Sequence, residues 1–279
     1  MKKLILISFM FIAFIVNVNA KEFLQGDTIE VPATYIDGPM KCTVILPEQY
    51  AYNDSVCFPV LYLLNGYDGD YTSWPSLQPG LDSLATQYGM IFVCPSGRDS
   101  WYWDSPIDST MQMESFFVKE LIPYIDANYR TIPDARHRAI TGLSMGGHGA
   151  LWLAIRHSDL FGSVGSTSGG VNIIPFVKAK PNSWKMAKRL GTYVGNEGLW
   201  ESRTVINLVD SLQPKQLNII FDCGVDDFFA GVNADLHEAL KARKIPHDYI
   251  SRPGNHSQSY WRNAILFQLV FFNEQFKKQ

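Results

Sequence analysis

The stretch of sequence that decides the fold runs Ile140-Thr141-Gly142-Leu143-Ser144-Met145-Gly146-Gly147-His148-Gly149-Ala150. An apolar run that breaks at a Gly-x-Ser-x-Gly unit and continues through small residues is typical of a serine held on a sharp turn between a strand and a helix. This turn forces the serine into a sparsely populated backbone conformation, and Gly142 and Gly146 leave out the side chains that would collide there. We therefore interpret Ser144 as a nucleophile. The alternative is a glycine-rich turn that contains a serine by chance.

The rest of the chain alternates between short strands and helices. Residues 28–34 and 41–46 predict an antiparallel hairpin, and further strands are predicted at 58–64, 90–94, 137–142, 161–166, 217–222 and 248–252. Helices are predicted at 81–88, 111–129, 145–157, 205–212, 233–243 and 260–276. This order predicts an α/β fold with a mostly parallel central sheet, helices on both faces, and a site at the carboxyl ends of the strands.

The first twenty residues differ from the rest of the chain. A basic start with Lys2 and Lys3 is followed by an apolar stretch and small residues ending at Ala20, which is typical of a secretory signal peptide. We therefore expect residues 1–20 to be removed and residues 21–279 to form one large domain that is secreted or periplasmic. No later stretch has the roughly 18 uninterrupted apolar residues that a membrane span needs. A retained N-terminal anchor is the alternative.

Charge and cysteine content argue against several functions. The chain has 24 basic and 27 acidic residues, and loss of Lys2 and Lys3 would leave a net charge of −5, which does not favour binding to nucleic acid. Of the four cysteines, only Cys42 and Cys57 are candidates for a disulfide, because they are expected on consecutive strands. No cysteine or histidine spacing resembles a zinc site, and the sequence implies no metal or organic cofactor.

A nucleophilic serine needs an imidazole to take its proton and a carboxylate to orient that imidazole. In this type of fold, the acid and then the histidine follow the serine along the chain. Among the histidines after Ser144, only His256 lies in a glycine-rich turn after a late strand, whereas His237 and His247 are expected to be surface or packing residues. His148 is expected to be structural, because its side chain, four residues further along the helix, points away from the hydroxyl.

The acid should follow the strand that precedes His256, which leaves three candidates, Asp222, Asp226 and Asp227. Asp222 still belongs to the strand. Asp226 and Asp227 share the next turn, and only one of two adjacent side chains can face the imidazole. The other one would cap the next helix or face solvent.

Two backbone amides must stabilise the oxyanion that forms during acyl transfer. The first is expected from Met145, because the opening amides of a helix have no partner inside the helix and carry partial positive charge. The second is expected from Tyr67, in the loop that follows the strand at 58–64. A simple turn at Gly66 is the alternative interpretation of that loop.

Two segments are candidates for binding a substrate. The loop at 98–106 contains Trp101, Tyr102 and Trp103, and aromatic residues in an exposed loop at the carboxyl ends of strands are typical of a substrate wall. The alternative is that these rings only cover the core. Residues 171–203 have no strand rhythm and are expected to form an insertion over the site, where substrate choice would reside.

With these residues in place, the chain resembles the esterase D-like branch of the α/β-hydrolases. That branch includes S-formylglutathione hydrolases, tributyrin-type esterases, and the feruloyl and acetylxylan esterases of carbohydrate esterase family one. The resemblance covers nearly all of the chain after residue 20. It rests on Leu63-Leu64-Asn65-Gly66, Ser100-Trp101-Tyr102-Trp103-Asp104-Ser105-Pro106, Glu120-Leu121-Ile122-Pro123-Tyr124-Ile125-Asp126, the stretch at 142–150, Gly224-Val225-Asp226-Asp227-Phe228 and Gly254-Asn255-His256.

The resemblance implies a role for each candidate residue. It implies Ser144 as nucleophile, Asp227 as acid and His256 as base. It also implies that the amides of Tyr67 and Met145 bind the oxyanion. Asn65 departs from the pattern, because many relatives have histidine before this glycine. An asparagine there can still order the loop through hydrogen bonds.

The resemblance and the leader together predict a secreted serine carboxylic-ester hydrolase that acts through an acyl-enzyme. Its expected substrates are small-molecule or oligosaccharide esters, above all short acyl, acetyl or feruloyl esters of plant polysaccharides. Trp101 and Trp103 would then stack on a phenolic or sugar ring. Neither nucleic acid nor a membrane span in the mature protein is expected. An acyltransferase that passes the acyl group to a sugar and an inactive carbohydrate-binding relative are the alternatives.

Overall fold

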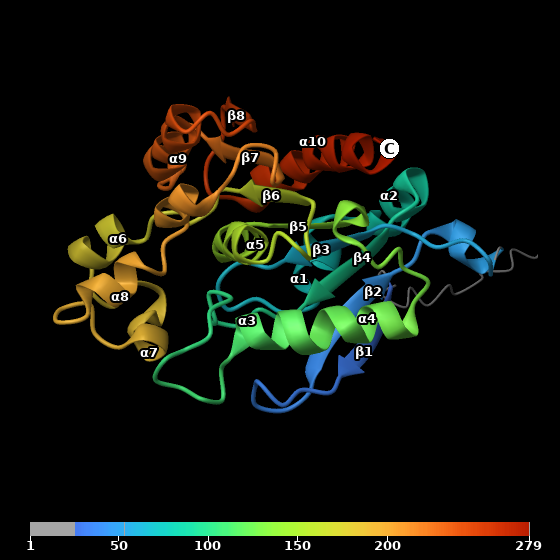
Figure 1. Cartoon of the computed structure of the whole chain (residues 1–279), viewed down its shortest axis with the longest axis horizontal. Coiled ribbons are helices and arrows are strands. Elements are labelled where there is room, and N and C mark those ends of the chain that lie inside the picture. Colours follow the sequence, from blue (N-terminus) through green and yellow to red (C-terminus); the bar gives the residue numbers. More distant parts are fainter. Residues whose placement is uncertain (1–25, 53, 279) are drawn as a thin grey trace, which may run out of the picture.

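The computed structural model describes residues 26–52 and 54–278, so the predicted signal peptide at 1–20 lies outside the described residues. One eight-stranded sheet has the order β1-β2-β4-β3-β5-β6-β7-β8 (Figure 1). The strands β1 and β2 pair antiparallel, β2 pairs antiparallel with β4, and the other five pairings are parallel. The predicted α/β fold is therefore confirmed. The strands are β1 (Asp27–Val31), β2 (Met40–Ile45), β3 (Val60–Leu64), β4 (Ile91–Pro95), β5 (Arg138–Gly142), β6 (Ser163–Thr167), β7 (Asn218–Gly224) and β8 (Asp248–Arg252).

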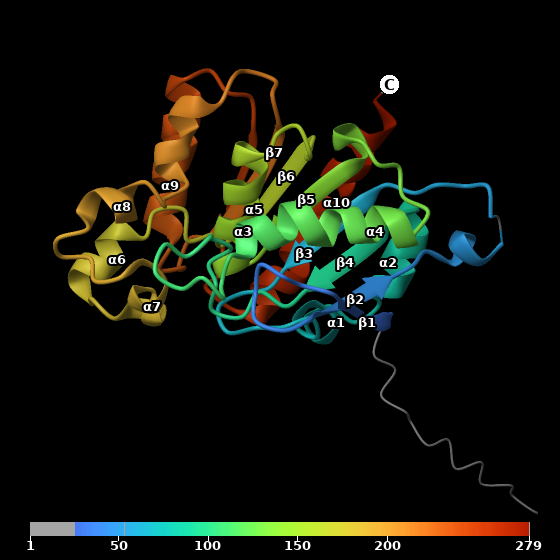
Figure 2. The same cartoon turned by 60° about the horizontal axis from the view of Figure 1, so that its bottom comes forward.

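Helices cover both faces of the sheet (Figures 1 and 2). Successive residues of a strand point to opposite faces, and Leu61 and Leu63 of β3 pack with α1, α2 and α10, whereas Tyr62 and Leu64 pack with α3, α4, α5 and α9. All five β3 residues are buried, which explains the continuous apolar run. The helices are α1 (Ser73–Leu77), α2 (Leu81–Tyr88), α3 (Met113–Phe116), α4 (Ile122–Asn128), α5 (Met145–Arg156), α6 (Ile174–Ala179), α7 (Ala187–Leu190), α8 (Glu197–Glu201), α9 (Ala230–Ala242) and α10 (Gln258–Lys277).

Three helical segments differ from their predictions. The helix predicted at 111–129 consists of α3, a π-helical turn at Phe117–Leu121, and α4. Pro123 lacks an N–H group and its ring crowds the preceding turn, so the wider π turn fits directly before it. The helix predicted at 205–212 is a 3-10 helix at Ile206–Ser211. Helix α1 is only five residues long, too short for a periodic pattern, and was not predicted.

The disulfide for which Cys42 and Cys57 were candidates does not form. Cys42 is buried in β2, Cys57 is exposed before β3, and all four cysteines are free. Strand β4 lies between β2 and β3 in the sheet, so two strands that are consecutive in the sequence are not neighbours in space. Within residues 26–52 and 54–278, no helix combines the length and apolar character that crossing a membrane requires.

Residues 171–203, here named the lobe, form a group of short helices at one end of the molecule. Helices α6, α7 and α8 lie together on the side away from β1 and β2 in both views (Figures 1 and 2). Val177, Leu190 and Trp200 of the lobe are buried and join the core that α5 and α9 form with the sheet. The lobe is therefore packed onto the body of the protein rather than loosely attached.

A buried carboxylate joins α3 to the end of α5. Glu114 accepts hydrogen bonds from Trp152 Nε1 at 2.9 Å and Arg156 Nε at 2.7 Å, and its Oε1 lies 2.8 Å from His157 Nε2. Burial alone would raise the pKa of Glu114, but these partners lower it to about 2. A carboxyl group whose pKa is lowered by folding stabilises the protein above its ordinary pKa, and this contribution is lost as the pH falls.

We expect Glu114→Gln to lower the free energy of unfolding at pH 7 by about 2 kcal/mol, because hydrogen bonds to a charged group contribute roughly 1.5–3 kcal/mol. In the wild type, this contribution should disappear as the pH falls from the ordinary value of 4.5 towards 2. Urea unfolding at pH 7 and pH 3 measures both effects. A difference between variant and wild type that is equally large at the two pH values would contradict the assignment.

Candidate active site

Ser144 lies on a sharp turn between β5 and α5, as the sequence predicts. Its φ of 56° and ψ of −117° fall in a region that residues other than glycine rarely occupy. The Ser144 N–H donates to the Thr167 carbonyl at 2.9 Å, and the Ser144 carbonyl accepts from the N–H groups of His148 at 3.1 Å and Gly170 at 3.2 Å. These bonds to β6 and α5 hold the strained turn in place.

Two glycines make this turn sterically possible. A Cβ on Gly142 would lie 2.4 Å from the Gly146 carbonyl carbon, and a Cβ on Gly146 would lie 2.3 Å from the Leu64 carbonyl oxygen. Backbone atoms cannot move aside as a flexible side chain can. Only glycine therefore fits at either position.

His256 and Asp227 approach Ser144 from two later loops. His256 Nε2 lies 3.0 Å from Ser144 Oγ, and His256 Nδ1 lies 2.9 Å from Asp227 Oδ2. Asp227 follows β7 and His256 follows β8, and because these strands are parallel neighbours, both loops leave the same edge of the sheet. A Cβ on Gly224 would lie 2.2 Å from the Gly254 carbonyl oxygen, so the two loops pack backbone against backbone. The three predicted side chains therefore form one hydrogen-bonded series, from the Asp227 carboxylate through the His256 imidazole to the Ser144 hydroxyl.

The two adjacent aspartates have different surroundings. Asp227 is buried, and its Oδ1 also accepts from the Phe229 N–H at 2.8 Å. Burial alone would raise its pKa, but the hydrogen bonds from His256 and Phe229 lower the pKa of Asp227 below its ordinary value. Asp226 is exposed to solvent, one of the two positions expected for the aspartate that does not face the imidazole.

The remaining histidine and aspartate candidates lie in other places. His148 is buried with Nδ1 3.0 Å from the Gly170 carbonyl, and burial lowers its pKa to about 4, so the ring stays neutral. His237 Nδ1 lies 2.8 Å from His247 Nε2, and this pair packs on aromatic residues of β7 and β8. Asp222 stays within β7, where burial raises its pKa to about 6. Among the described residues, none of these four side chains bonds to the Ser144 hydroxyl.

The backbone amides predicted to bind the oxyanion lie beside Ser144. Met145 is the first residue of α5, and Tyr67 follows Gly66, on which a Cβ would lie 3.5 Å from Ser144 Cβ. Neither the Tyr67 nor the Met145 N–H has a hydrogen-bond acceptor in the part of the chain that the structure describes. Two free donors next to the hydroxyl are what a developing oxyanion requires.

Asn65 orders the loop that carries Tyr67. Its side chain is buried, its Oδ1 accepts from the Gly97 N–H at 2.7 Å, and its Nδ2 donates to the Gly66 carbonyl at 2.7 Å. The Tyr102 hydroxyl lies 3.3 Å from the same Oδ1. Asparagine therefore connects the ends of β3 and β4 through hydrogen bonds, as expected of an amide at this position.

We expect Asn65→Ala to lower kcat by about 10- to 100-fold with little change in KM, because an unsupported loop would misplace the Tyr67 amide, and loss of one oxyanion donor costs roughly 10²–10³ in rate. Steady-state hydrolysis of p-nitrophenyl acetate measures the effect. The exposed Asn207 provides a control as Asn207→Ala. An unchanged kcat in a folded Asn65→Ala variant would contradict the role given to the loop.

Ser144 and His256 line a cavity of about 660 Å³. Its walls have two characters. Aromatic rings are contributed by Trp184 of the lobe, Phe228 and Trp261. Hydroxyl groups are contributed by Thr72, which precedes α1, and by Ser73 and Ser76 within α1. The ring centroids of Phe228 and Trp261 lie 4.3 Å and 4.9 Å from that of His256, so both rings pack against the imidazole.

The prediction that Trp101 and Trp103 form a substrate wall is wrong. Their exposed fractions are 1% and 0%, and they stack on each other with ring centroids 5.5 Å apart. Trp101 and Tyr102 have φ values of 55° and 61°, which turn the loop back onto α5. There Gly149 leaves room for the Tyr102 ring, since a Cβ would lie 2.1 Å from it. The rings cover the core, which was the alternative interpretation.

Three of the aromatic residues that line the cavity, Trp184, Phe228 and Trp261, were not predicted. Phe228 directly follows Asp227, and Trp261 is five residues after His256, so closeness to the predicted acid and base was an available signal. For Trp184, the only signals in the sequence were its aromatic side chain and its position in the predicted insertion. It is the residue by which the lobe reaches the cavity.

The Esterase family model matches residues 33–272, and the chain therefore belongs to this esterase family. The predicted resemblance to esterase D-like proteins is confirmed, because S-formylglutathione hydrolases and a ferulic acid esterase are among the related proteins. The fold is accordingly that of the α/β-hydrolases.

Three relatives illustrate the similarity. An esterase of Mycobacterium tuberculosis is 29% identical over 238 residues, which are 76% of this chain and 51% of the relative, so the chain spans about half the length of that protein. An acetyl esterase of Caldicellulosiruptor saccharolyticus is 28% identical over 222 residues, covering 76% of this chain and 82% of the relative. A solved ferulic acid esterase has a TM-score of 0.76 and 28% identity, covering 89% of this chain and 98% of the other.

Proposed function

We propose that the protein is a serine carboxylic-ester hydrolase with Ser144 as nucleophile, His256 as base and Asp227 as acid. The observation that carries this proposal is the unbroken hydrogen-bonded series from Asp227 through His256 to a hydroxyl on a strained turn. Membership of the esterase family and two relatives named as esterases support ester hydrolysis.

In the proposed mechanism, Ser144 Oγ attacks the ester carbonyl carbon while its proton passes to His256 Nε2. The Asp227 carboxylate stabilises the imidazolium, and the amides of Tyr67 and Met145 donate to the oxyanion. The tetrahedral intermediate then expels the alcohol, which takes the proton from His256 and leaves the acyl group on Ser144. Water activated by His256 repeats these steps, which releases the acid and restores the serine.

We propose short acyl or hydroxycinnamoyl esters of plant polysaccharide fragments as substrates. Trp184 and Phe228 give the cavity an apolar, flat surface suited to an acyl chain or an aromatic ring. The hydroxyl groups of Thr72, Ser73 and Ser76 can exchange hydrogen bonds with sugar hydroxyls. The relatives named acetyl esterase and ferulic acid esterase support this class of substrate.

We also propose that the enzyme is exported. The basic start and apolar stretch of residues 1–20 support a signal peptide, which would leave residues 21–279 as a single secreted or periplasmic domain with the lobe as an insertion. N-terminal sequencing of the protein recovered from the medium or periplasm tests this. A mature chain that still begins at Met1 would contradict the proposal.

A substrate panel with p-nitrophenyl acetate, p-nitrophenyl butyrate, methyl ferulate and acetylated xylan tests the function. We expect hydrolysis of at least one short acyl or feruloyl ester and labelling of Ser144 by a fluorophosphonate. Failure to hydrolyse any ester, together with no labelling, would contradict the proposal and favour a carbohydrate-binding role. Reactions with an added xylo-oligosaccharide separate the two enzymatic roles, since mainly acylated sugar as product would indicate an acyltransferase.

A further inference from the structure

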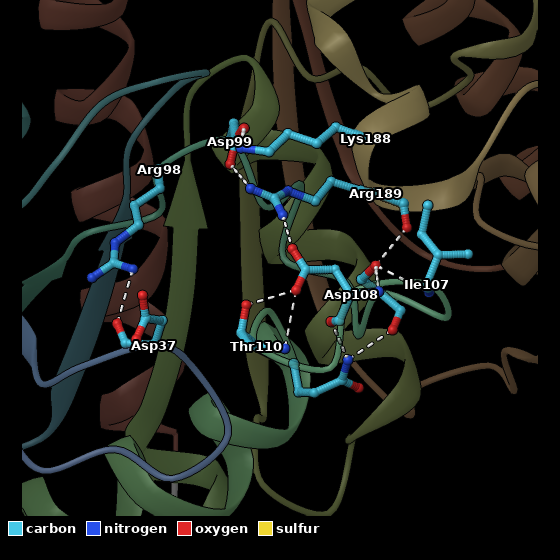
Figure 3. A network of polar contacts seen from close by, with 10 residues as sticks. Asp37, Arg98, Asp99, Ile107, Asp108, Thr110, Lys188 and Arg189 are labelled. Carbon is cyan, nitrogen blue, oxygen red and sulfur yellow. Dashed lines mark hydrogen bonds and ion pairs between the residues drawn. The ribbon is translucent and has the colours of Figure 1, made fainter.

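A buried arginine outside the proposed mechanism joins the lobe to the loop after β4. Arg189 belongs to α7, its side chain is 4% exposed, and its guanidinium pairs with the carboxylates of Asp99 and Asp108 (Figure 3). The Lys188 ammonium lies 3.5 Å from the second oxygen of Asp99. The Ser105 hydroxyl donates to the Arg189 carbonyl at 2.7 Å. Helix α7 is therefore held through both its charged side chains and its backbone.

Asp99, in turn, is fixed to one wall of the cavity. It follows Arg98, whose N–H donates to the Gly69 carbonyl at 3.0 Å and whose carbonyl accepts from the Asp68 N–H at 2.8 Å. Gly69 and Tyr67 line the cavity. Burial, together with the negative charges of Asp99 and Asp68, raises the pKa of the Tyr67 hydroxyl.

The cavity lining also includes Trp184 of the lobe. Its ring stacks on Phe228, with centroids 6.1 Å apart and an interplanar angle of 26°. Trp184 and Lys185 have φ values of 47° and 50°, in the left-handed region. Such conformations cost of order 1–3 kcal/mol each and persist only where surrounding contacts hold them. The anchor at Arg189 comes four residues after this strained pair and restrains it from the C-terminal side.

We infer that Arg189 is a specificity-determining positioning residue. Through Asp99 and its neighbour Arg98, it connects the lobe to the loop that carries Tyr67 and so sets the width of the substrate cavity. This inference rests on the proposed ester hydrolysis. An aromatic acyl group large enough to reach Trp184 depends on that width. An acetyl group contacts only the immediate surroundings of Ser144, so its binding does not depend on the width of the cavity.

The chemistry of arginine suits this role. Its planar guanidinium presents several N–H donors in fixed directions, so one side chain can bind two carboxylates at once. A lysine at this position would offer a single charge centre on a flexible stem and would hold one carboxylate at a time. Removal of the guanidinium would also leave the charges of Asp99 and Asp108 without their shared partner.

The test compares kcat/KM for methyl ferulate and p-nitrophenyl acetate in the wild type and in Arg189→Met, Arg189→Lys and the surface control Arg243→Met. In Arg189→Met we expect kcat/KM for methyl ferulate to fall on the order of 10- to 100-fold, mainly through KM, because pocket contacts discriminate substrates by such factors. The acetate should change by less than about threefold, Arg189→Lys should recover part of the loss, and Arg243→Met should match the wild type. Equal losses on both esters, or none, would overturn the inference.

A second measurement does not depend on activity. The rate of hydrogen–deuterium exchange of residues 184–190 should rise in Arg189→Met and stay unchanged in Arg243→Met. An unchanged exchange rate in Arg189→Met would show that Arg189 does not hold the lobe in place. If Arg189→Met does not fold, Asp99→Asn removes the same ion pair with a side chain of equal size. A wild type that hydrolyses none of the four esters in the substrate panel and is not labelled at Ser144 would instead refute the proposed function. An active wild type with an unaltered ester preference in Arg189→Met would refute only the inference.

Discussion

Ser144→Ala is expected to lower kcat by on the order of 10⁵- to 10⁶-fold while leaving the fold intact. The hydroxyl is the only group that forms the acyl-enzyme in the proposed mechanism, and its removal leaves the imidazole of His256 without a nucleophile to activate. The fold should survive because the Ser144 backbone, not its side chain, makes the hydrogen bonds to Thr167, His148 and Gly170.

Turnover of p-nitrophenyl acetate, fluorophosphonate labelling and thermal unfolding together measure this result. Ser211→Ala is the matched control, because Ser211 is an exposed serine that does not line the cavity. The control should keep wild-type labelling and nearly all activity. A folded Ser144→Ala variant that retains a substantial fraction of wild-type kcat would refute Ser144 as the nucleophile.

Asp227→Asn is expected to lower kcat by on the order of 10⁴-fold, because an amide in place of the carboxylate stabilises the wrong tautomer of the histidine. Asp227 Oδ2 lies 2.9 Å from His256 Nδ1 and Oδ1 lies 3.1 Å from it, so the carboxylate both orients the ring and stabilises its charged form. With an asparagine, the amide N–H₂ group can face Nδ1 and leave the proton on Nε2, where it blocks proton transfer from Ser144.

Two other aspartates serve as controls for this substitution. Asp226→Asn changes the adjacent exposed carboxylate, and Asp222→Asn changes a buried carboxylate in β7 that binds Thr167 and Gln268 instead of the histidine. Both variants should keep kcat within a small factor of the wild type when measured on the same ester. If Asp226→Asn lost as much activity as Asp227→Asn, the acid would have been assigned to the wrong residue.

The parts of the molecule that were predicted well are those that depend on local backbone geometry. The Gly-x-Ser-x-Gly unit predicted the turn at Ser144, because only glycine fits where the turn meets the backbone of β3. Helix α2 (Leu81–Tyr88) and strand β8 (Asp248–Arg252) have the bounds expected of them. His256 was singled out by its glycine-rich turn and by the order of serine, acid and histidine along the chain.

The predictions that failed concern contacts between distant segments. Cys42 and Cys57 were candidates for a disulfide because their strands are consecutive, but β4 occupies the position between those strands. Trp101 and Trp103 were assigned to a substrate wall because they lie in a loop, but positive φ values fold that loop onto α5. Neither the sheet order nor these backbone angles leave a regular pattern in the sequence.

By itself, the sequence determined the alternation of strands and helices, the sharp turn at Ser144 and the chain order of its partners, because these follow from the conformational preferences of short segments. The resemblance to a known family added Asp227 as the expected acid. Only the tertiary structure decided which aromatic rings line the cavity and where the lobe is anchored. The physical reason is that the direction of a side chain in a loop is set by what packs against it. Arg189, for example, pairs with a carboxylate 90 residues away along the chain.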